Sequence, residues 1–493
     1  MALLVDALRL GCAVGMPFAL GLLLLWAVGG ERLPLGRWER WASAWALGWG
    51  ALTLEMLGVG LARWGSWSPP VLLALWGGMA TLAVGLRALS GPLRPPRGPS
   101  GCDLVLGVPS PTGHSGRGRY LWLAAGLLVV GQWATVALHA IAWPVNDLDA
   151  WSIWAFKARI FSVSQGIPLA YFGDASKLFS HPDYPLLVPL SETWIYGWLG
   201  RPDDQAMMAF FALSAAGTVV ITAGALHRVY GRIGALLGAA GLLCVPFFVA
   251  RGPTGDADVP LALISAASIA YLWRWLDRPE RRTNGLLALA LCGVFGGLGV
   301  WTKKEGLLLC ALTVPVVALA AWQRVELGGR MAHIVKARAA GRAVGVFGLA
   351  AAAVAGPWLL FVAVRRPLTR DFLPFTVQTL VAHLDRLPVI AGFVGLRLLD
   401  VSRWNLIWVG LAGAVVLHRR ALRRGGPLAY LLALLCLQVA VDGALFVFSD
   451  WQPYTLHLRT ALDRLLLHSL PLAVMLLVAL VVGRPGQEGP ASG

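Results

Sequence analysis

Long apolar runs constrain this chain more than any other feature of its sequence. A helix that crosses a bilayer needs roughly 20 predominantly apolar residues. Every backbone N–H and C=O in hydrocarbon must be satisfied within its own segment, so runs of this length form helices. We expect about thirteen spanning helices, over residues 7–28, 41–62, 69–89, 120–142, 205–226, 232–250, 259–276, 285–301, 306–322, 343–363, 404–418, 428–447 and 464–482.

Composition indicates the same class of protein. The 493 residues are 57% apolar and only 13% charged, with a mean hydropathy of +0.68, whereas soluble domains carry about 25% charged residues. The 23 tryptophans suit belts at the membrane interface. The net charge of +16 reflects arginine in cytoplasmic loops, and no motif for reading nucleic acid is present. We therefore predict an all-α, polytopic integral membrane protein that does not bind nucleic acid.

Cysteines and the N-terminus add two exclusions. Five of the six cysteines lie inside apolar runs and no Cys-x-x-Cys pair occurs, so neither a disulfide framework nor a zinc site is expected. The first apolar run lacks a charged leading region and is interpreted as a membrane helix, not a cleaved signal.

Arginine and lysine set the predicted orientation, because they accumulate in cytoplasmic loops. With the N-terminus outside, the clusters around Arg37, Arg228, Arg274–Arg282 and Arg419–Arg424 all face the cytoplasm. The segment 186–200 tests this scheme, because counting it as a span would separate the acidic residues on either side of it. It is short, contains a glutamate and has two prolines near its start. We interpret it as an interfacial or re-entrant helix.

The chain divides into five predicted regions, with no convincing internal repeat. They are three N-terminal spans in 1–89, a basic Pro/Gly-rich cytoplasmic linker in 90–118, a core in 119–325 with an external loop at 143–204, further spans in 326–483 with an external loop at 364–403, and a tail in 484–493. Linker and tail lack periodicity and are expected to be disordered.

The first external loop is expected to carry a surface helix near 149–164. Trp151, Trp154, Ala158 and Phe161 share one helical stripe there. Such a helix lies on the membrane, with Lys157 and Arg159 facing elsewhere.

Four short polar strings interrupt the apolar sequence, and the predicted topology puts all of them on the outer side. Charged groups at the mouths of membrane helices are costly, so they need a functional reason. The strings are Asn146-Asp147-Leu148-Asp149-Ala150-Trp151, His181-Pro182-Asp183-Tyr184-Pro185, Gly255-Asp256-Ala257-Asp258-Val259-Pro260 and Thr302-Lys303-Lys304-Glu305-Gly306.

Two pairs of acids are candidates for acid–base chemistry. Asp147 and Asp149 follow the span that ends near Ala142, and Asp256 and Asp258 follow another. A partly desolvated carboxylate can act as general base towards a hydroxyl. The structural alternative is that these acids cap the following helices. A divalent cation bridging the first pair is a further hypothesis, since carboxylate oxygens suit it; no metal ligand set is assigned.

The basic residues of the outer face are candidates for binding phosphate. Lys303 and Lys304 oppose the positive-inside bias, as does Arg464 beside Asp463, and lysine is a compact partner for phosphate. The alternative is snorkelling, with Glu305 as a local counterion.

In the second string, His181 is a candidate base or metal ligand or an ordinary loop residue, with Asp183 beside it. Lys157, Asp183, Asp256 and Glu305 complete the predicted binding residues.

In this order, the strings resemble the GT-C superfamily of polytopic glycosyltransferases. The likeness is to bacterial relatives of protein O-mannosyltransferases and of the lipid A aminoarabinose transferase, over about residues 120–325. In those families an external Asp follows the first core helix, a Pro-containing string opens an interfacial helix, a second Asp precedes a Pro, and a Thr-Lys pair follows. The matching residues here are Asp149, His181-Pro182-Asp183-Tyr184-Pro185 with Gly200, Asp258-Val259-Pro260 and Thr302-Lys303. Arg464 and Pro471 match the family's closing helix only loosely.

The resemblance implies transfer of a sugar from a polyprenyl-phosphate carrier to an acceptor hydroxyl, with inversion, at the outer face of a bacterial plasma membrane. Asp149 would be the base and Asp258 would orient the acceptor or share that role. Lys303, Lys304 and Arg464 would stabilise the phosphate. The acceptor is a lipid, a glycan or a protein. The Asp-Glu pair of the mannosyltransferases is replaced by Asp147-Leu148-Asp149, and the Trp-Trp-Asp motif of oligosaccharyltransferases is absent.

The main alternative is a membrane transporter or lipid flippase that uses the same charged groups. Transporters usually contain paired halves with broken helices at mid-bilayer, and the sequence has no such pairing. A third hypothesis, a non-catalytic membrane scaffold, does not explain why charged residues gather on one face of the membrane.

Overall fold

The computed structural model describes residues 2–29, 35–62, 67–89, 116–277, 282–325, 330–369 and 371–483. Within these ranges the chain forms helices and loops, with a single isolated β-bridge between Phe372 and Ser449. This confirms the all-α prediction. The predicted linker, up to residue 115, and the tail from residue 484 lie outside the described residues.

Eleven helices of the described residues are long and apolar enough to cross a membrane, so the protein is an integral membrane protein. They are α1 (Ala2–Val28), α2 (Arg37–Ala62), α3 (Pro69–Leu89), α4 (Gly116–Ala142), α7 (Met208–Leu243), α9 (Asp258–Asp277), α10 (Arg282–Thr302), α11 (Glu305–Gln323), α12 (Arg330–Arg365), α18 (Pro427–Ala444) and α19 (Tyr454–Val482).

The expected number of thirteen is not confirmed, for two local reasons. The segment 404–418 is divided between α15 (Val401–Trp404) and α16 (Ile407–Leu417), and α16 has only 11 residues. The segment 232–250 is divided between the last 12 residues of α7, after Gly231, and the short α8 (Pro246–Arg251).

The helix α7 turns back on itself at Gly231. This glycine has φ 64° and ψ −154°, which a residue with a side chain rarely adopts. A Cβ placed on Gly238 would lie 2.5 Å from the Leu226 side chain and 3.5 Å from the Cα of Ala223. Residues 15 apart in a straight helix would be about 22 Å apart. The two arms of α7 are therefore antiparallel, and the turn falls between the predicted cytoplasmic residues Arg228 and Arg232.

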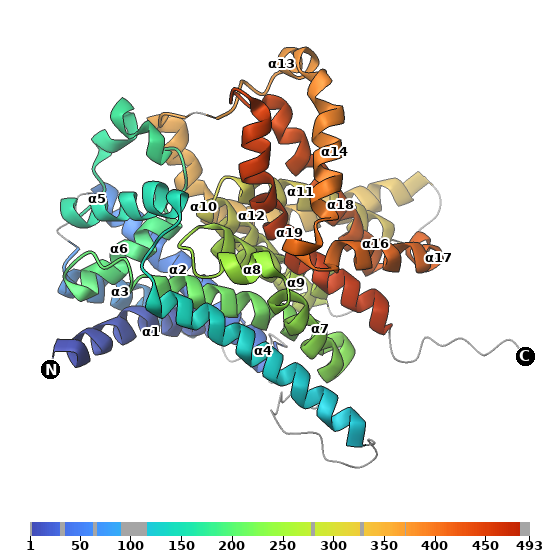
Figure 1. Ribbon diagram of the computed structural model, residues 1–493, viewed down its shortest axis with the longest axis horizontal. Coiled ribbons are helices and arrows are strands. Elements are labelled where there is room, and N and C mark those ends of the chain that lie inside the picture. The colour runs from blue at the N-terminus through green and yellow to red at the C-terminus, as the bar shows by residue number, and fades with distance from the viewer. Residues whose placement is uncertain are drawn as a thin grey trace, which may run out of the picture.

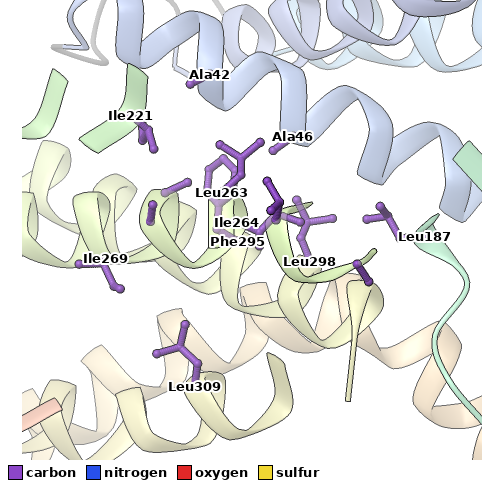
Figure 2. Close-up of a cluster of buried hydrophobic side chains, with 14 of the residues drawn as sticks. Ala42, Ala46, Leu187, Ile221, Leu263, Ile264, Ile269, Phe295, Leu298 and Leu309 are labelled. Atoms are coloured by element: carbon purple, nitrogen blue, oxygen red, sulfur yellow. The ribbon is translucent and has the colours of Figure 1, made fainter. Parts of the chain in front are cut away.

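The helix α9 forms the centre of the bundle. In its most apolar 18-residue stretch, 94% of the residues are buried. The helix packs against α7, α10 and α19 (Figure 1). Figure 2 shows Leu263 and Ile264 of α9 among Phe295 and Leu298 of α10 and Ala46 of α2. By contrast, only 11% of the residues in the corresponding stretch of α4 are buried, because α4 runs along the outside of the bundle.

The loop at 143–204, predicted to be external, is packed against the bundle. It contains the π-helical turn η2 (Ala150–Ala155), α5 (Phe156–Ser164) and α6 (Leu187–Leu199). At 13 residues α6 is about 20 Å long, too short for a hydrocarbon core of about 30 Å. It ends at Gly200, whose φ is 75°, so segment 186–200 is not a span.

One expectation for this loop is wrong. Trp154, Ala158 and Phe161 of the predicted stripe are fully buried, whereas Trp151 is 53% exposed. Lys157, which was expected to face elsewhere, is fully buried as well. The reason is that α5 packs against α6 on one side, while the Tyr184 ring of the second polar string lies 5.6 Å from Lys157 Nζ on another. Arg159 is the outward residue, with a side chain 49% exposed.

The loop at 364–403, also predicted to be external, contains α13 (Val377–Ala382) and α14 (Leu387–Leu398). The five-residue α17 (Arg419–Arg423) follows α16. In Figure 1 α13 and α14 project from the bundle near the start of α19.

Candidate active site

Asp258 is the centre of a buried charged cluster. It is the first residue of α9 and is fully buried. Its Oδ1 accepts hydrogen bonds from Lys303 Nζ at 2.7 Å and lies 3.0 Å from His468 Nε2, and its Oδ2 accepts from Arg464 Nε at 2.6 Å. The start of α9, the end of α10 and one turn of α19 therefore meet at a single carboxylate.

Asp149 joins the same cluster through Arg464. The guanidinium donates from Nη1 to Asp149 Oδ2 and from Nε to Asp258. The Asp149 side chain is 35% exposed, whereas that of Asp258 is 0% exposed. One arginine thus links the acids of the first and third polar strings, and Asp149 is the accessible one.

The connection between α10 and α11 brings Lys303 to this cluster. The chain reverses within a few residues, where Lys303 N donates to Gly299 O at 3.1 Å and Gly306 N donates to Lys303 O at 2.9 Å. A Cβ on Gly306 would lie 2.0 Å from the Gly299 oxygen, so only glycine fits. Glu305 also pairs with Lys303 at 2.9 Å.

The Lys303 ammonium keeps its charge although it is only 3% exposed. Burial disfavours the charged form, but the carboxylates of Asp258 and Glu305 outweigh burial and raise the pKa of Lys303 above its ordinary value. The site therefore carries a fixed positive charge beside its central acid.

Arg251 organises the other two acids. Its Nη1 lies 2.6 Å from Asp147 Oδ2 and its Nη2 lies 3.0 Å from Asp256 Oδ2. Burial raises the pKa of Asp256 to about 6, although Arg464 and Arg251 oppose the shift. These contacts place all four acids of the two predicted pairs around two arginines.

The second polar string closes one side of the cluster. Asp183 accepts a hydrogen bond from Lys304, whose Nζ also lies 4.9 Å from the centre of the Tyr184 ring. His181 Nδ1 lies 3.1 Å from Asp371 Oδ2, and His181 lowers the pKa of Asp371 to about 2 against the effect of burial. The string is thus bonded to the α10–α11 connection through Lys304 and contacts the loop at 364–403 through Asp371.

Lys157 lies beneath this string. Its Nζ is 5.6 Å from the Tyr184 ring and 5.2 Å from the Trp154 ring, and among the described residues it has no hydrogen-bond partner. Burial lowers the pKa of Lys157 to about 7, although Asp183 opposes the shift. Burial also raises the pKa of the neighbouring Glu192 well above its ordinary value. The amine is therefore a supporting group, away from solvent.

The structure thus brings together every residue that the sequence singled out, with Lys157 as a buried neighbour. It also adds three residues that the sequence does not predict: Arg251, His468 and Asp371. Two sequence signals pointed to the first two. Arg251 is a basic residue at the end of an apolar run, and His468 follows Arg464 at the i+4 spacing that shares one helix face. No local signal marks Asp371, since its contact with His181 spans two distant loops.

The acids that were candidates for bridging a divalent cation, Asp147 and Asp149, are paired with cationic side chains. The carboxylates of Asp147 and Asp149 each pair with an arginine. Within the described parts of the chain, no three His, Cys, Asp or Glu side chains gather to hold a metal ion.

Comparison with known proteins agrees with the resemblance in the middle of the chain. The family model described as dolichyl-phosphate-mannose-protein mannosyltransferase matches residues 185–340. This segment contains the third and fourth polar strings and only Pro185 of the second. No curated protein matches the chain.

Two similar solved structures are crystal structures of ArnT from Cupriavidus metallidurans, one bound to undecaprenyl phosphate and one in the apo state. They are 16% and 14% identical to the chain, each with a TM-score of 0.47. The alignments cover 74% of this chain and 60% of those proteins, so the chain spans less than two thirds of their length.

Proposed function

We propose that the protein is a membrane glycosyltransferase that moves a sugar from a polyprenyl-phosphate carrier to an acceptor hydroxyl, with inversion, at the non-cytoplasmic surface. One observation carries the proposal: Arg464 bonds both Asp149 and Asp258, with Lys303 on the far side of Asp258. The accessible carboxylate of Asp149 is therefore bonded to the same arginine that, together with Lys303, surrounds Asp258. The match to the mannosyltransferase family model supports the reaction class.

The leaving group requires charge stabilisation. As the bond between the sugar C1 and the phosphate oxygen breaks, its electron pair stays on polyprenyl phosphate. Preorganised positive groups stabilise such developing charge most effectively where water is excluded. Arg464 and Lys304 have side chains 14% and 37% exposed and would contact the phosphate. Lys303 is buried between Asp258 and Glu305 and would contribute through its field.

The acceptor requires a base. Its oxygen forms the new bond to C1 from the face opposite the phosphate, and its proton passes to the Asp149 carboxylate. A phosphate bound to Arg464 would compete with Asp149 for the guanidinium. Donor binding would therefore release the base when it is needed.

Asp258 has a different role in this proposal. It is fully buried and surrounded by Lys303, Arg464 and His468. An acceptor has no free oxygen of Asp258 to approach. We assign it as a positioning residue that holds the cations in place.

The experiment uses the purified full chain in vesicles that contain polyprenyl-phosphate hexose labelled in the sugar. The proposal predicts release of free polyprenyl phosphate together with label on an acceptor or in water. Movement of the intact labelled lipid across the bilayer, without cleavage, would support the transporter instead.

A further inference from the structure

Three side chains next to the charged cluster offer buried oxygen atoms that have no hydrogen-bond partner among the described residues. They are Glu305 at the start of α11, through Oε2, and Gln438 and Asp442 of α18, through Oε1 and Oδ2. Gln438 and Asp442 are only 3% and 2% exposed. A buried acceptor without a partner is costly, so these atoms point to a ligand. We name the three side chains the α11–α18 oxygen cluster.

The packing of α18 brings the three side chains to one place. Gln438 and Asp442 are four residues apart and share one face of α18, which packs against α9, α11 and α19 (Figure 1). Ser449 Oγ lies 2.9 Å from His457 Nδ1, where the chain passes from α18 to α19. Gln438 lies eleven residues before Ser449, and His468 lies eleven residues after His457. The chain therefore returns to the same depth, and Gln438 is level with His468.

The same level holds the acid of α11. His468 Nε2 lies 3.0 Å from Asp258 Oδ1, and His468 also interacts electrostatically with Glu305. Asp442 in turn interacts electrostatically with Glu305 and with Lys303. The oxygen cluster is therefore a buried extension of the charged cluster, on the side of Lys303 that faces α18.

The oxygen cluster carries one negative charge that no cation of the described residues neutralises. Lys303 pairs with Glu305 at 2.9 Å and with Asp258 at 2.7 Å, and Asp258 also pairs with Arg464. Asp442 has no ion-pair partner in the described part of the chain. Buried charges in proteins are paired or coordinate metal ions. The missing partner of Asp442 therefore carries one positive charge.

The chemistry of the cluster selects the kind of cation. All three unpartnered atoms are oxygens, two from carboxylates and one from an amide, and such oxygens suit hard cations. With Glu305 already paired to Lys303, the single remaining charge of Asp442 matches a monovalent ion. The Glu305 side chain is 19% exposed. An ion can therefore enter beside Glu305 without crossing hydrocarbon.

We propose that the α11–α18 oxygen cluster binds a sodium ion between the carboxylates of Glu305 and Asp442 and the amide oxygen of Gln438. The ion neutralises Asp442 and holds Glu305 where it contacts Lys303. It is thus a positioning ion for the fixed charges around Asp258. The inference does not depend on glycosyl transfer, because the residues that hold the ion are in place without a donor.

Sodium-dependent stability tests the proposal. The purified full chain in detergent is unfolded by heat over a series of sodium chloride concentrations, with choline chloride holding the ionic strength constant and EDTA removing divalent ions. An ion that binds only the folded state raises the unfolding temperature, so we expect a saturable rise with sodium. Equilibrium binding of radioactive sodium should give one ion per chain. Absence of binding, or equal stabilisation in choline alone, would overturn the proposal.

Two variants locate the ion. Asp442→Asn removes one charged ligand and should raise the sodium concentration for half-maximal stabilisation by about tenfold or more, because the charge of the ligands tunes affinity at oxygen sites. Asp385→Asn makes the same chemical change at an exposed carboxylate of η5 (Leu384–Arg386) and should leave the response unchanged. If Asp442→Asn fails to fold, Gln438→Leu removes the amide oxygen at similar volume and should also weaken sodium binding.

A protonated Asp442 is the alternative, and it gives a different result. Wild type would then be indifferent to sodium, and Asp442→Asn would be at least as stable. That result, or a sodium response that both α18 variants retain, would overturn the proposal. Neither measurement uses turnover. Protein that binds sodium as expected but releases no polyprenyl phosphate therefore contradicts the glycosyltransferase proposal and not the ion site.

Discussion

Asp149→Asn is the substitution that separates catalysis from folding in this site. The Asp149 side chain is 35% exposed and its ion-pair partner is Arg464. An asparagine oxygen still accepts a hydrogen bond from that arginine but cannot take the acceptor's proton. Loss of a partly exposed ion pair costs roughly 0–1 kcal/mol. Loss of a positioned base lowers the rate by about 10²–10⁴-fold.

Asp258→Asn is the matched comparison, because it makes the same chemical change at a fully buried carboxylate. The neutral amide removes the negative charge that Lys303 and Arg464 pair with, so two buried cations lose their shared counterion. Breaking a buried ion pair on one side costs about 3–5 kcal/mol. We therefore expect Asp258→Asn to lower the yield and the thermal unfolding temperature, whereas Asp149→Asn leaves both close to wild type.

The assay compares both variants with wild type in detergent. Folding is followed by size-exclusion chromatography and the thermal unfolding midpoint, and turnover by release of polyprenyl phosphate from labelled polyprenyl-phosphate hexose. Turnover by Asp149→Asn within threefold of wild type would remove Asp149 as the base. Full stability of Asp258→Asn would refute its role as the anchor of the cations.

Three other predictions follow from individual contacts. Lys157→Met should raise the unfolding temperature at pH 7 and below, because a pKa lowered from 10.5 to about 7 corresponds to at most about 5 kcal/mol of buried-charge penalty. The folded state binds fewer protons than the unfolded state between those two values, so wild-type stability should rise with pH through that window and the variant should not; a parallel pH dependence would contradict this. Gly306→Ala should sharply reduce folded yield, since its Cβ would meet the Gly299 oxygen at 2.0 Å, whereas Gly345→Ala, with nothing within 4 Å, should not; equal yields would show that the α10–α11 connection relaxes freely. EDTA should leave donor cleavage unchanged, because arginines already neutralise Asp147 and Asp149; activity restored only by a divalent cation would favour the bridging-metal hypothesis.

The positions of most helices were predictable, because helix formation depends on residues that are close together in the sequence. Apolar length identifies the spans, and the arginines beside Gly231 mark the turn within α7. The number of spans was not predictable, because segment 404–418 breaks into two short helices at a position with no proline or glycine.

The site was predictable only in part, because its contacts are made by tertiary packing. The polar strings could be found because charge is costly at a membrane helix end. The burial of Lys157 could not, since α5 is covered from more than one side. Likewise, Asp258 and Asp149 look equivalent in sequence, and only packing makes one a buried anchor and the other accessible.

The most direct measurement is an experimental structure of the protein with polyprenyl phosphate. The account predicts a phosphate within ion-pairing distance of Arg464 and Lys304, about 4 Å or less, with the Asp149 carboxylate released from the guanidinium beside it. A phosphate bound away from these residues, or Asp149 and Asp258 opening onto opposite sides of the membrane, would contradict it.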